Sequence, residues 1–521
     1  MTYTRRYKSP SYTDDISLLA IPGNSPATCL SRRKVAAVMS SGLITANTWA
    51  VVGYSAVILP QVTNTNSTLQ LTSTQASWFA TLPLFMCIPL STIGGLISEW
   101  LGPRRSTLIL SPLVAASFVV MHLASWKLIL EAEMAYVILM ICRVVQGVLL
   151  ALHASIPSVY ICDISDSSHR GMFTSLLEPC IALGFVLCYL LGGYVHWYTA
   201  AWLLPLITSV PGFLGFLIAP ESPPWLVRKG KEAEAMTTLL RLRGSSEEAE
   251  QEVALLKECV KMEQKHSFCQ SVRLLKERSI VIPMAISALV IVFKELCGLS
   301  VIMIYMVRIF QLAGVGFNPF WISAVVSSVR LACNLLGSGL VHRFPRKECL
   351  LGGIICTAVG MTTVGTFFFL QSRKDDLSHL GWLPVAGFIV LIVGMGVSVY
   401  PVSWLIAAEV LPGAVSFLGM GVSVTGHFIT SFLISKTFDD VTSLIGLHGL
   451  FWSYALACVT FSLFVIIFVP ETRGRSQKEI EEIWVRSSGE KQLSDRSNNI
   501  KLLQKEGEGL TGAAGHEDSE K

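Results

Sequence analysis

Five ionisable side chains stand inside stretches of sequence that are otherwise apolar: Glu178, Lys294, Glu295, Arg330 and His427. A charge at the centre of a membrane-spanning segment costs about 2.5–3.5 kcal/mol, so such residues face a bundle interior or a solute path. Side chains of these types can bind a charged or zwitterionic solute, pass a proton through Glu178 or His427, or neutralise one another. Because the two acids balance the two bases, a buried ion network is one interpretation.

The elements that position these side chains are runs of about 20 apolar residues, the length that crosses a bilayer as a helix. The chain is 52% hydrophobic and only 15% charged, whereas soluble proteins carry about 25% charged residues. Lipid-exposed backbone must be satisfied within its own segment, so we expect helices. The twelve expected spans are 35–59, 75–98, 106–125, 135–161, 172–195, 199–219, 280–306, 317–341, 349–370, 382–407, 415–436 and 447–469.

Two short phrases recur at a nearly fixed offset. Pro220-Glu221-Ser222 matches Pro470-Glu471-Thr472, and Arg104-Arg105 matches Arg346-Lys347, each after an apolar run. Such self-similarity indicates a duplicated architecture, here a membrane protein of two related halves. The expected organisation is a cytosolic tail at 1–34, a six-helix bundle at 35–220, a cytosolic helical linker at 221–278, a second six-helix bundle at 279–470 and a cytosolic tail at 471–521, disordered after about 487.

Lysine and arginine gather in the linker, both tails and the loops on one side of the expected spans. The positive-inside rule therefore places both termini in the cytosol. Asn66-Ser67-Thr68 then lies in the first outer loop, where Asn66 is a candidate glycosylation site.

Several function classes are not expected. The net charge of +4 is too small, and the cations too scattered, for a nucleic-acid partner. The sequence has no phosphate-binding glycine loop, no His/Cys cluster with metal-ligand spacing and no nucleophile with its base, so neither an enzyme nor a cofactor or metal site is expected. The expected partners are a small solute and membrane lipid.

Six motifs follow one another at spacings that together resemble the sugar porter family of the major facilitator superfamily, over about residues 35–485. The pattern is most similar to insect facilitated trehalose and glucose transporters. The motifs are Gly94 to Arg105, Arg143 to Gly147, Pro157 to Gly171, Pro220 to Leu226, Pro401 to Pro412 and Pro470 to Arg475. The resemblance implies an all-α polytopic fold in which two six-helix bundles rock around a central path and carry sugar across the plasma membrane.

The resemblance also implies that charges of these motifs form a cytosolic latch in the outward-facing state. Their recurrence in both halves favours a latch over ordinary solvated loop charge, since several weak pairs can bias a two-state equilibrium. The implied gating charges are Glu99, Arg104, Arg105, Arg143, Asp163, Arg170, Glu221, Arg343, Arg346, Lys347, Glu409, Glu471 and Arg475. Gly94, Gly95, Gly337 and Gly339 are expected to let helices approach closely.

The positions that correspond to the family's sugar site depart from its neutral amides and aromatic rings. They hold Glu178, Lys294, Glu295, Ser300, Arg330, Trp404, His427 and Ser431, of which only Trp404 keeps the family's residue type. At 1.5 Å per residue, Lys294 and Arg330 lie roughly 20 Å from the cytosolic ends of their spans. Glu178 is a candidate partner for Lys294, because Lys294 and Glu295 are adjacent and do not share a helix face.

Three functions stay open on the sequence alone. The first is facilitative transport of a hexose or trehalose, with the buried charges serving as a structural network. The second is transport of a charged solute, or transport coupled to a proton. The third is a nutrient sensor or scaffold that keeps the transporter fold without transporting.

Overall fold

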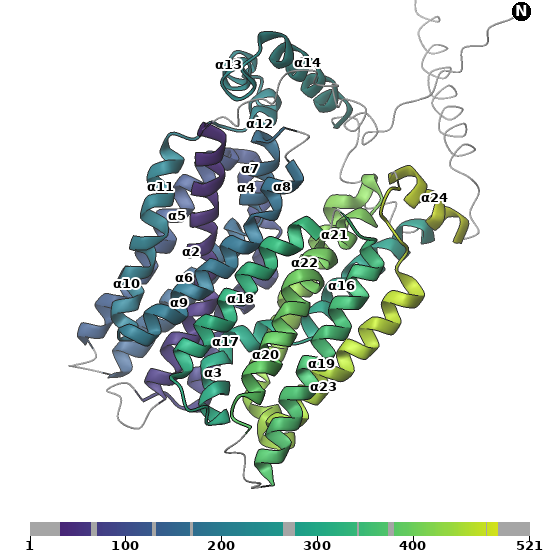
Figure 1. The fold of residues 1–521 in the computed structure, drawn as a ribbon. Helices are drawn as coiled ribbons and strands as arrows, with labels where there is room; N and C mark the ends of the chain where they lie inside the picture. The colour runs from purple at the N-terminus through teal and green to yellow at the C-terminus, as the bar shows by residue number, and fades with distance from the viewer. Residues whose placement is uncertain are drawn as a thin grey trace, which may run out of the picture.

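The computed structural model describes residues 32–63, 70–127, 132–166, 170–263, 277–340, 343–373, 380–475 and 477–487. Helices and turns make up this part of the chain, with no strand among the described residues. Most of the expected N-terminal tail, Asn66 and everything after 487 lie outside it. The expected all-α class is confirmed (Figure 1).

The first half and the linker contain thirteen helices. They are α2 (Arg32–Val62), α3 (Ser73–Leu90), α4 (Ile93–Leu101), α5 (Pro103–Lys127), α6 (Ala132–His153), α7 (Ile156–Ile164), α8 (Arg170–Ser175), α9 (Leu177–Tyr194), α10 (Trp197–Ile207), α11 (Ser209–Leu217), α12 (Pro223–Arg228), α13 (Glu232–Arg243) and α14 (Ser246–Glu263).

The second half follows after the linker. Its elements are α16 (Arg278–Leu296), α17 (Leu299–Ala313), α18 (Pro319–Leu340), α19 (Arg346–Ser372), α20 (Leu383–Gly394), the π-helix η1 (Met395–Val399), α21 (Tyr400–Glu409), the 3-10 turn η2 (Gly413–Val415), α22 (Ser416–Lys436), α23 (Phe438–Phe468) and α24 (Gln477–Ser487).

Eleven spans among the described residues are long and apolar enough to cross a membrane, and a twelfth results when α3 and α4 count as one bent span. These two helices meet at 65°, next to Pro89, which cannot donate the backbone hydrogen bond of a continuous helix. The expectation of a twelve-span polytopic protein agrees with this structure.

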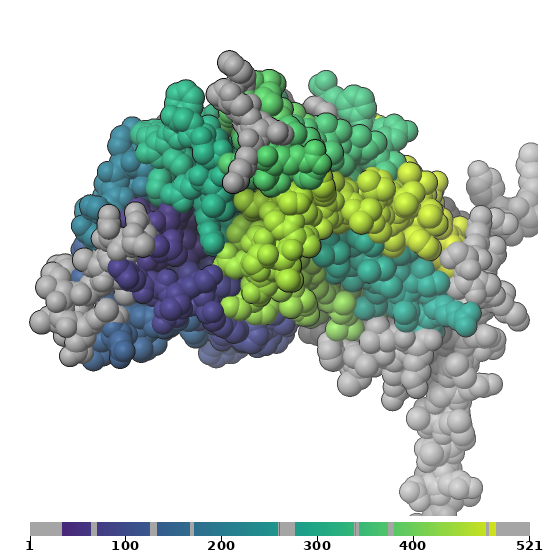
Figure 2. Space-filling model, turned by 90° about the horizontal axis from the view of Figure 1, so that it is seen from below, coloured from purple at the N-terminus to yellow at the C-terminus, as the bar shows by residue number. Residues whose placement is uncertain are grey.

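The two halves lie side by side, with α2 to α11 on one side of Figure 1 and α16 to α23 on the other. Three helix pairs make most of the contact between them: α9 with α18, α3 with α22, and α2 with α17. The linker helices α12 to α14 extend from one end of the first half, which we call the linker end. Figure 2 views the opposite end, where segments of both halves meet side by side.

Two equivalent glycines allow helices to approach within backbone contact. A Cβ atom at Gly94 would lie 2.4 Å from the Leu152 carbonyl oxygen, and one at Gly337 would lie 2.5 Å from that of Val397. The expectation for Gly95 and Gly339 is wrong, because a Cβ would meet only the Phe417 ring at 3.8 Å in the first case and nothing within 4 Å in the second. One glycine of each pair therefore faces away from the neighbouring helix.

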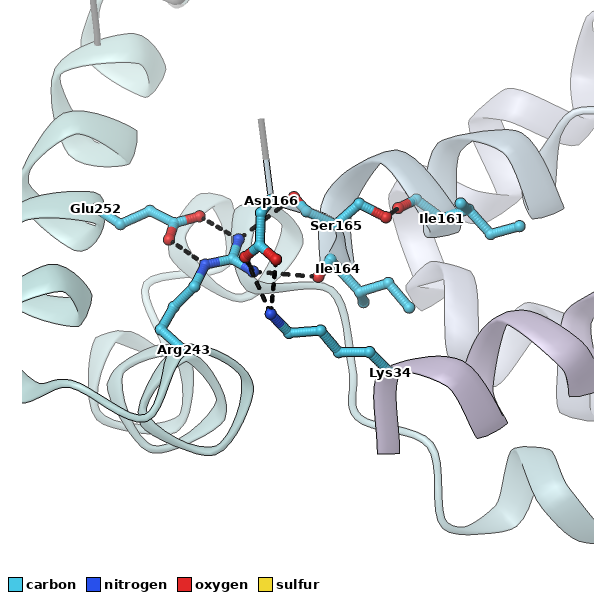
Figure 3. Close-up of polar contacts among 7 residues, drawn as sticks. All are labelled: Lys34, Ile161, Ile164, Ser165, Asp166, Arg243 and Glu252. Atoms are coloured by element: carbon cyan, nitrogen blue, oxygen red, sulfur yellow. Dashed lines mark hydrogen bonds and ion pairs between the residues drawn. The ribbon is translucent and has the colours of Figure 1, made fainter. Parts of the chain in front are cut away.

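The linker is clamped to the first half by three ion pairs around Arg243 and Asp166 (Figure 3). Arg243 lies 2.5 Å from Asp166 and 2.8 Å from Glu252, while Lys34 of α2 reaches Asp166 at 2.8 Å. Burial opposes the charge of Arg243, but the carboxylates of Glu252 and Asp166 outweigh it and raise the pKa of the guanidinium. One arginine thus joins α13, α14 and the end of α7.

Replacing Arg243 by glutamine is expected to release the linker helices without unfolding the bundle. A hydrogen bond to a charged group contributes about 1.5–3 kcal/mol, so amide hydrogen exchange in 232–263 should accelerate by about tenfold or more. The exposed Arg241 provides the matched control, Arg241→Gln, which should leave the exchange rates unchanged. Equal protection in both variants would contradict the clamp.

Candidate functional site

The carboxylate of Glu295 is the centre of a fully buried polar cluster in the second half. Oε2 accepts hydrogen bonds from Ser300 at 2.5 Å and Ser431 at 2.7 Å, and Oε1 accepts one from the Tyr400 hydroxyl at 2.7 Å. Nδ1 of His427 lies 3.0 Å from Oε1. Four helices, α16, α17, α21 and α22, therefore converge on one carboxylate, whose acceptor capacity is largely used.

Lys294 completes this cluster with a fully buried ammonium group. Its Nζ lies 3.1 Å from Glu295 Oε1, 4.0 Å from the centre of the Tyr400 ring and 4.5 Å from that of Trp404. A cation over two aromatic faces is stabilised by the ring quadrupoles. The expectation that Lys294 and Glu295 cannot meet is wrong, because the long lysine side chain turns back across the last turn of α16.

Breaks in two spans direct these side chains toward one another. Helix α16 ends at Leu296, and Gly298 adopts a φ of +88° before α17 begins, which brings Ser300 under Glu295. A Cβ at Gly298 would lie 2.7 Å from the Tyr454 ring, so the turn requires glycine on both counts. The π-helix before Tyr400 changes the register of α21, an irregularity found frequently at functional sites.

A second, looser ion pair joins the two halves. Glu178 of α9 lies 3.9 Å from the guanidinium of Arg330 on α18, and the Asn334 side chain donates to the Glu178 backbone carbonyl at 3.2 Å. The Arg330 guanidinium also lies 5.5 Å from the Phe185 ring and 5.6 Å from that of Tyr400. Tyr400 therefore separates this pair from the Lys294–Glu295 cluster.

The eight expected site residues thus form two adjoining groups. Lys294, Glu295, Ser300, Trp404, His427 and Ser431 make up the buried cluster, and Glu178 and Arg330 lie at the interface between the halves. Glu178 pairs with Arg330 rather than with Lys294. The sequence analysis missed Tyr400, whose only signal was its place next to Pro401 on the span that carries Trp404.

Arg143 lies in the middle of α6, not at a helix end among the gating charges, so its assignment there is wrong. The fully buried guanidinium donates to the carbonyl oxygens of Val51 at 2.8 Å and Phe79 at 2.9 Å, and to the Ser55 hydroxyl. It also donates to Gln146 at 3.0 Å. Arg143 thus ties α2, α3 and α6 together through neutral acceptors.

The comparisons with known proteins agree with this architecture. The family model described as "Sugar (and other) transporter" matches residues 36–484. This chain belongs to that sugar transporter family. The facilitated trehalose transporter Tret1 of Polypedilum vanderplanki is 29% identical over 429 residues, which are 82% of this chain and 83% of the relative. Tret1 of Culex quinquefasciatus is 28% identical over 463 residues, 88% of this chain and 87% of the relative.

One relative is much longer than the matched region. The chain spans 53% of Tret1 of Anopheles gambiae, to which it is 29% identical. Among solved structures, the inward-open xylose transporter XylE from E. coli superposes with a TM-score of 0.67 at 21% identity, covering 87% of this chain and 99% of that chain. That likeness shows the fold. The chain is therefore a multi-pass membrane transporter with a sugar substrate, and not an enzyme.

Charges at the linker end of this transporter pair within each half, in two equivalent arrangements. In the first half, Glu221 accepts from the Arg104 backbone N–H at 3.0 Å, and Ser222 donates to Asp163 at 2.5 Å. In the second half, Glu471 accepts from the Arg346 N–H at 3.0 Å, Thr472 donates to Glu409 at 2.6 Å, and Arg346 lies 3.6 Å from Glu409.

The latch expected from the motifs is therefore not assembled between the halves in this structure. Further side-chain bonds also stay within one half, from Arg104 to the Leu217 carbonyl and from Lys347 to the Ile466 and Val469 carbonyls. The side chains of Glu99, Arg105, Arg343 and Arg475 are exposed, and that of Arg170 lies outside the described residues. A role for these charges between the halves stays a prediction for another conformation.

Glu221 and Glu471 differ in how well their carboxylates are satisfied. Both hydrogen bonds to Glu221 fall on Oε1 and Oε2 has no partner, so burial raises the pKa of Glu221. Burial also acts on Glu471, but backbone N–H groups of Arg473, Lys347 and Arg346 outweigh it and lower the pKa of Glu471. The ionised form is thus favoured at Glu471 and disfavoured at Glu221.

Glutamine substitutions are expected to separate these two sites. Glu471→Gln removes acceptors for three N–H groups and should lower the free energy of unfolding by about 1–3 kcal/mol, whereas Glu221→Gln keeps the only oxygen in use and should change little. Because the pKa of Glu471 is lowered, its contribution is present above the usual glutamate pKa and is lost as pH falls through the lowered value. Thermal unfolding at several pH values measures both effects, and equal losses in the two variants would contradict the difference.

Polar contacts join the halves at the end opposite the linker. Ser73 donates to Asp439 at 3.3 Å, and the Lys436 ammonium donates to Ser77 at 3.1 Å while lying 4.3 Å from the Trp78 ring. Arg308 lies 2.7 Å from the same Asp439. Helices α3, α17, α22 and α23 are thus held together at this end.

A cavity of about 660 Å³ lies elsewhere, among α19, α20 and α23. Its lining includes Thr362, Thr363 and Thr366, whose hydroxyls all donate to carbonyls of their own helix. Because these hydroxyls are already bonded and the rest of the lining is mostly apolar, the cavity lacks the free polar groups that a sugar requires.

Proposed function

We propose that this chain is a facilitative transporter of a hexose or trehalose that works by alternating access in the plasma membrane, with both termini and the linker in the cytosol. The observation that carries the proposal is the polar and aromatic site at the interface of two halves that are tied together at one end only by polar side chains. The names of the insect relatives support trehalose as a candidate solute.

The distribution of contacts supports alternating access. At the linker end, each motif charge is paired within its own half, so the two halves can separate there without breaking those pairs. At the opposite end, Lys436, Asp439 and their partners join the halves. With the linker end in the cytosol, this arrangement corresponds to a transporter closed toward the outside. We place the bundle boundaries at 35–220 and 279–470.

The polar contacts at the outer end are weak individually, as reversible gating requires. Exposed ion pairs and hydrogen bonds contribute well below about 1 kcal/mol each, so a few of them bias an equilibrium of a few kcal/mol without locking it. The well-paired Lys294–Glu295 cluster lies within one half and can move as a unit.

A second candidate is proton-coupled transport, and Glu178 is the observation that favours it. Its carboxylate lies at the interface of the halves, its side chain is 26% exposed, and its one cation is 3.9 Å away. A structural neighbour, XylE, is described as a proton:xylose symporter. The sensor interpretation gains no comparable support, since the tied and separable ends suit a moving transporter.

Uptake by the purified protein in liposomes tests the proposal. We expect radiolabelled glucose or trehalose to enter in preference to a neutral polyol or a zwitterionic amino acid, and inward glucose flux to be accelerated by glucose loaded inside. Protein-free liposomes and an excess of unlabelled sugar are the controls. Absence of uptake from protein with a cooperative thermal unfolding transition would favour the sensor interpretation.

A further inference from the structure

We propose that the site selects a sugar that carries a carboxylate, such as a uronate or an aldonate, and that this carboxylate binds Arg330 while Glu178 takes up a proton. The inference rests on the proposed function of sugar transport and names the substrate class of the same site. It follows from which polar groups of the site are already bonded and which are not.

The buried cluster offers little to a neutral sugar. Glu295 already accepts three hydrogen bonds and contacts His427, and its Lys294 partner lies over the rings of Tyr400 and Trp404. Sugars commonly stack on exposed aromatic faces, but here the protein's own ammonium group covers one face of Trp404. The cluster is therefore a satisfied unit whose charges need no solute.

Arg330 is in the opposite condition. It is 4% exposed, yet no hydrogen bond from its guanidinium is found among the described residues, and its closest carboxylate atom lies 3.9 Å away. A guanidinium carries five donors arranged to grip a planar carboxylate, and charge-assisted bonds have lengths of about 2.7–2.9 Å. A buried arginine with free donors at the interface of the halves is thus suited to a bidentate anion.

Glu178 shows the complementary defect. Its Oε2 is buried without a hydrogen-bond donor among the described residues, although it belongs to the ion pair with Arg330. A pair at 3.9 Å with unused donors on one side and an unused acceptor on the other is loosely held. A ligand carboxylate can therefore replace Glu178 at Arg330 at small cost.

The charge balance of the spans favours an anion. The buried cations are Lys294, Arg330 and Arg143, and the carboxylates within the described spans near them are Glu178 and Glu295. Arg143 is bonded to neutral acceptors only, so one positive charge is left without a carboxylate. Because charges interact strongly in a low-dielectric interior, this excess attracts a monoanion into the interface.

Proton uptake follows from the exchange of partners. Once a ligand carboxylate occupies Arg330, an ionised Glu178 would remain beside it as a second anion, and two adjacent carboxylates cannot both stay charged. Glu178 then binds one proton, so one anion and one proton move together without net charge. The titratable side chains on or near the helices around Glu178 are Arg330 and Cys333 on α18, Tyr54 and Lys34 on α2, Cys180 and Tyr189 on α9, His196 before α10, Tyr400 on α21, and Lys294, Glu295 and His427 within electrostatic reach.

The first test uses the wild-type protein in liposomes with radiolabelled D-glucuronate and D-glucose. We expect glucuronate to enter, to inhibit glucose uptake, and to enter faster when the outside is more acidic than the inside. Entry of glucose with neither entry nor inhibition by glucuronate would overturn the inference and leave the proposed function intact. Failure of every sugar to enter would overturn both.

The second test measures binding, so that it does not depend on transport by the variants. Saturating D-glucuronate should raise the unfolding temperature of the wild type, more at pH 6 than at pH 7.5, because a ligand stabilises the state that it binds. Arg330→Gln should weaken this binding by about tenfold or more, and Glu178→Gln should bind equally well at both pH values. The exposed Arg241→Gln and Glu247→Gln are the matched controls. Unchanged binding in Arg330→Gln, or a retained pH dependence in Glu178→Gln, would overturn the inference.

Discussion

Replacing Lys294 by glutamine is expected to lower the free energy of unfolding by about 3–5 kcal/mol, because it leaves Glu295 as a buried carboxylate without its cation. The hydroxyls of Tyr400, Ser300 and Ser431 would still bond to that carboxylate, so the loss should fall toward the lower end of this range. The measurement is the unfolding transition of the purified protein in detergent, together with the yield of folded protein.

A double substitution identifies the true partner of Lys294. Lys294→Gln with Glu295→Gln removes both buried charges, and removal of a whole pair is often nearly neutral, so it should recover most of the lost stability. Lys294→Gln with Glu178→Gln should recover nothing, because Glu178 pairs with Arg330 at 3.9 Å. The reverse pattern of rescue would show that Lys294 pairs across the halves.

Replacing Arg143 by glutamine is expected to have the second-largest effect, a loss of about 2–4 kcal/mol. Arg143 donates to four acceptors on α2, α3 and α6 and lies 4.5 Å from the Phe79 ring, and each charged hydrogen bond contributes about 1.5–3 kcal/mol before compensation. Arg143→Lys should restore only part of the loss, since an ammonium group cannot reach acceptors spread around a planar fork.

A matched control for Arg143 lies two residues away on the same helix. The side chain of Val145 is 41% exposed and faces away from the bundle core, so Val145→Ala should change the unfolding transition by less than about 0.5 kcal/mol. Similar destabilisation by Arg143→Gln and Val145→Ala would contradict the role of Arg143 in tying three helices together.

The fold could be predicted from the sequence because its signals are long and redundant. Twelve apolar runs and two repeated motifs each extend over many residues, so the positions of helix breaks hardly affect them. The breaks themselves were not predicted. The run expected at 280–306 is divided at Gly298, and only the packing of Tyr454 against that glycine shows why a turn is required there.

The site was predicted in membership but not in its connections. Charges inside apolar runs identified Lys294, Glu295, Arg330 and Glu178, because the cost of burial applies to each residue separately. Their pairing depends on helix rotation and on long side chains, which a linear spacing does not contain. Arg143 shows the same limit, since its motif suggested a latch whereas the satisfied carbonyls of Val51 and Phe79 can be recognised only in three dimensions.

The central claim is that the two halves must separate at the end opposite the linker for sugar to enter. The most direct test introduces Ser73→Cys with Asp439→Cys, whose parent side chains lie 3.3 Å apart, and measures glucose uptake in liposomes before and after oxidation. Each single variant controls for the native cysteines. We predict that oxidation of the double variant abolishes uptake and that reduction restores it. Full uptake by completely cross-linked protein would contradict the account.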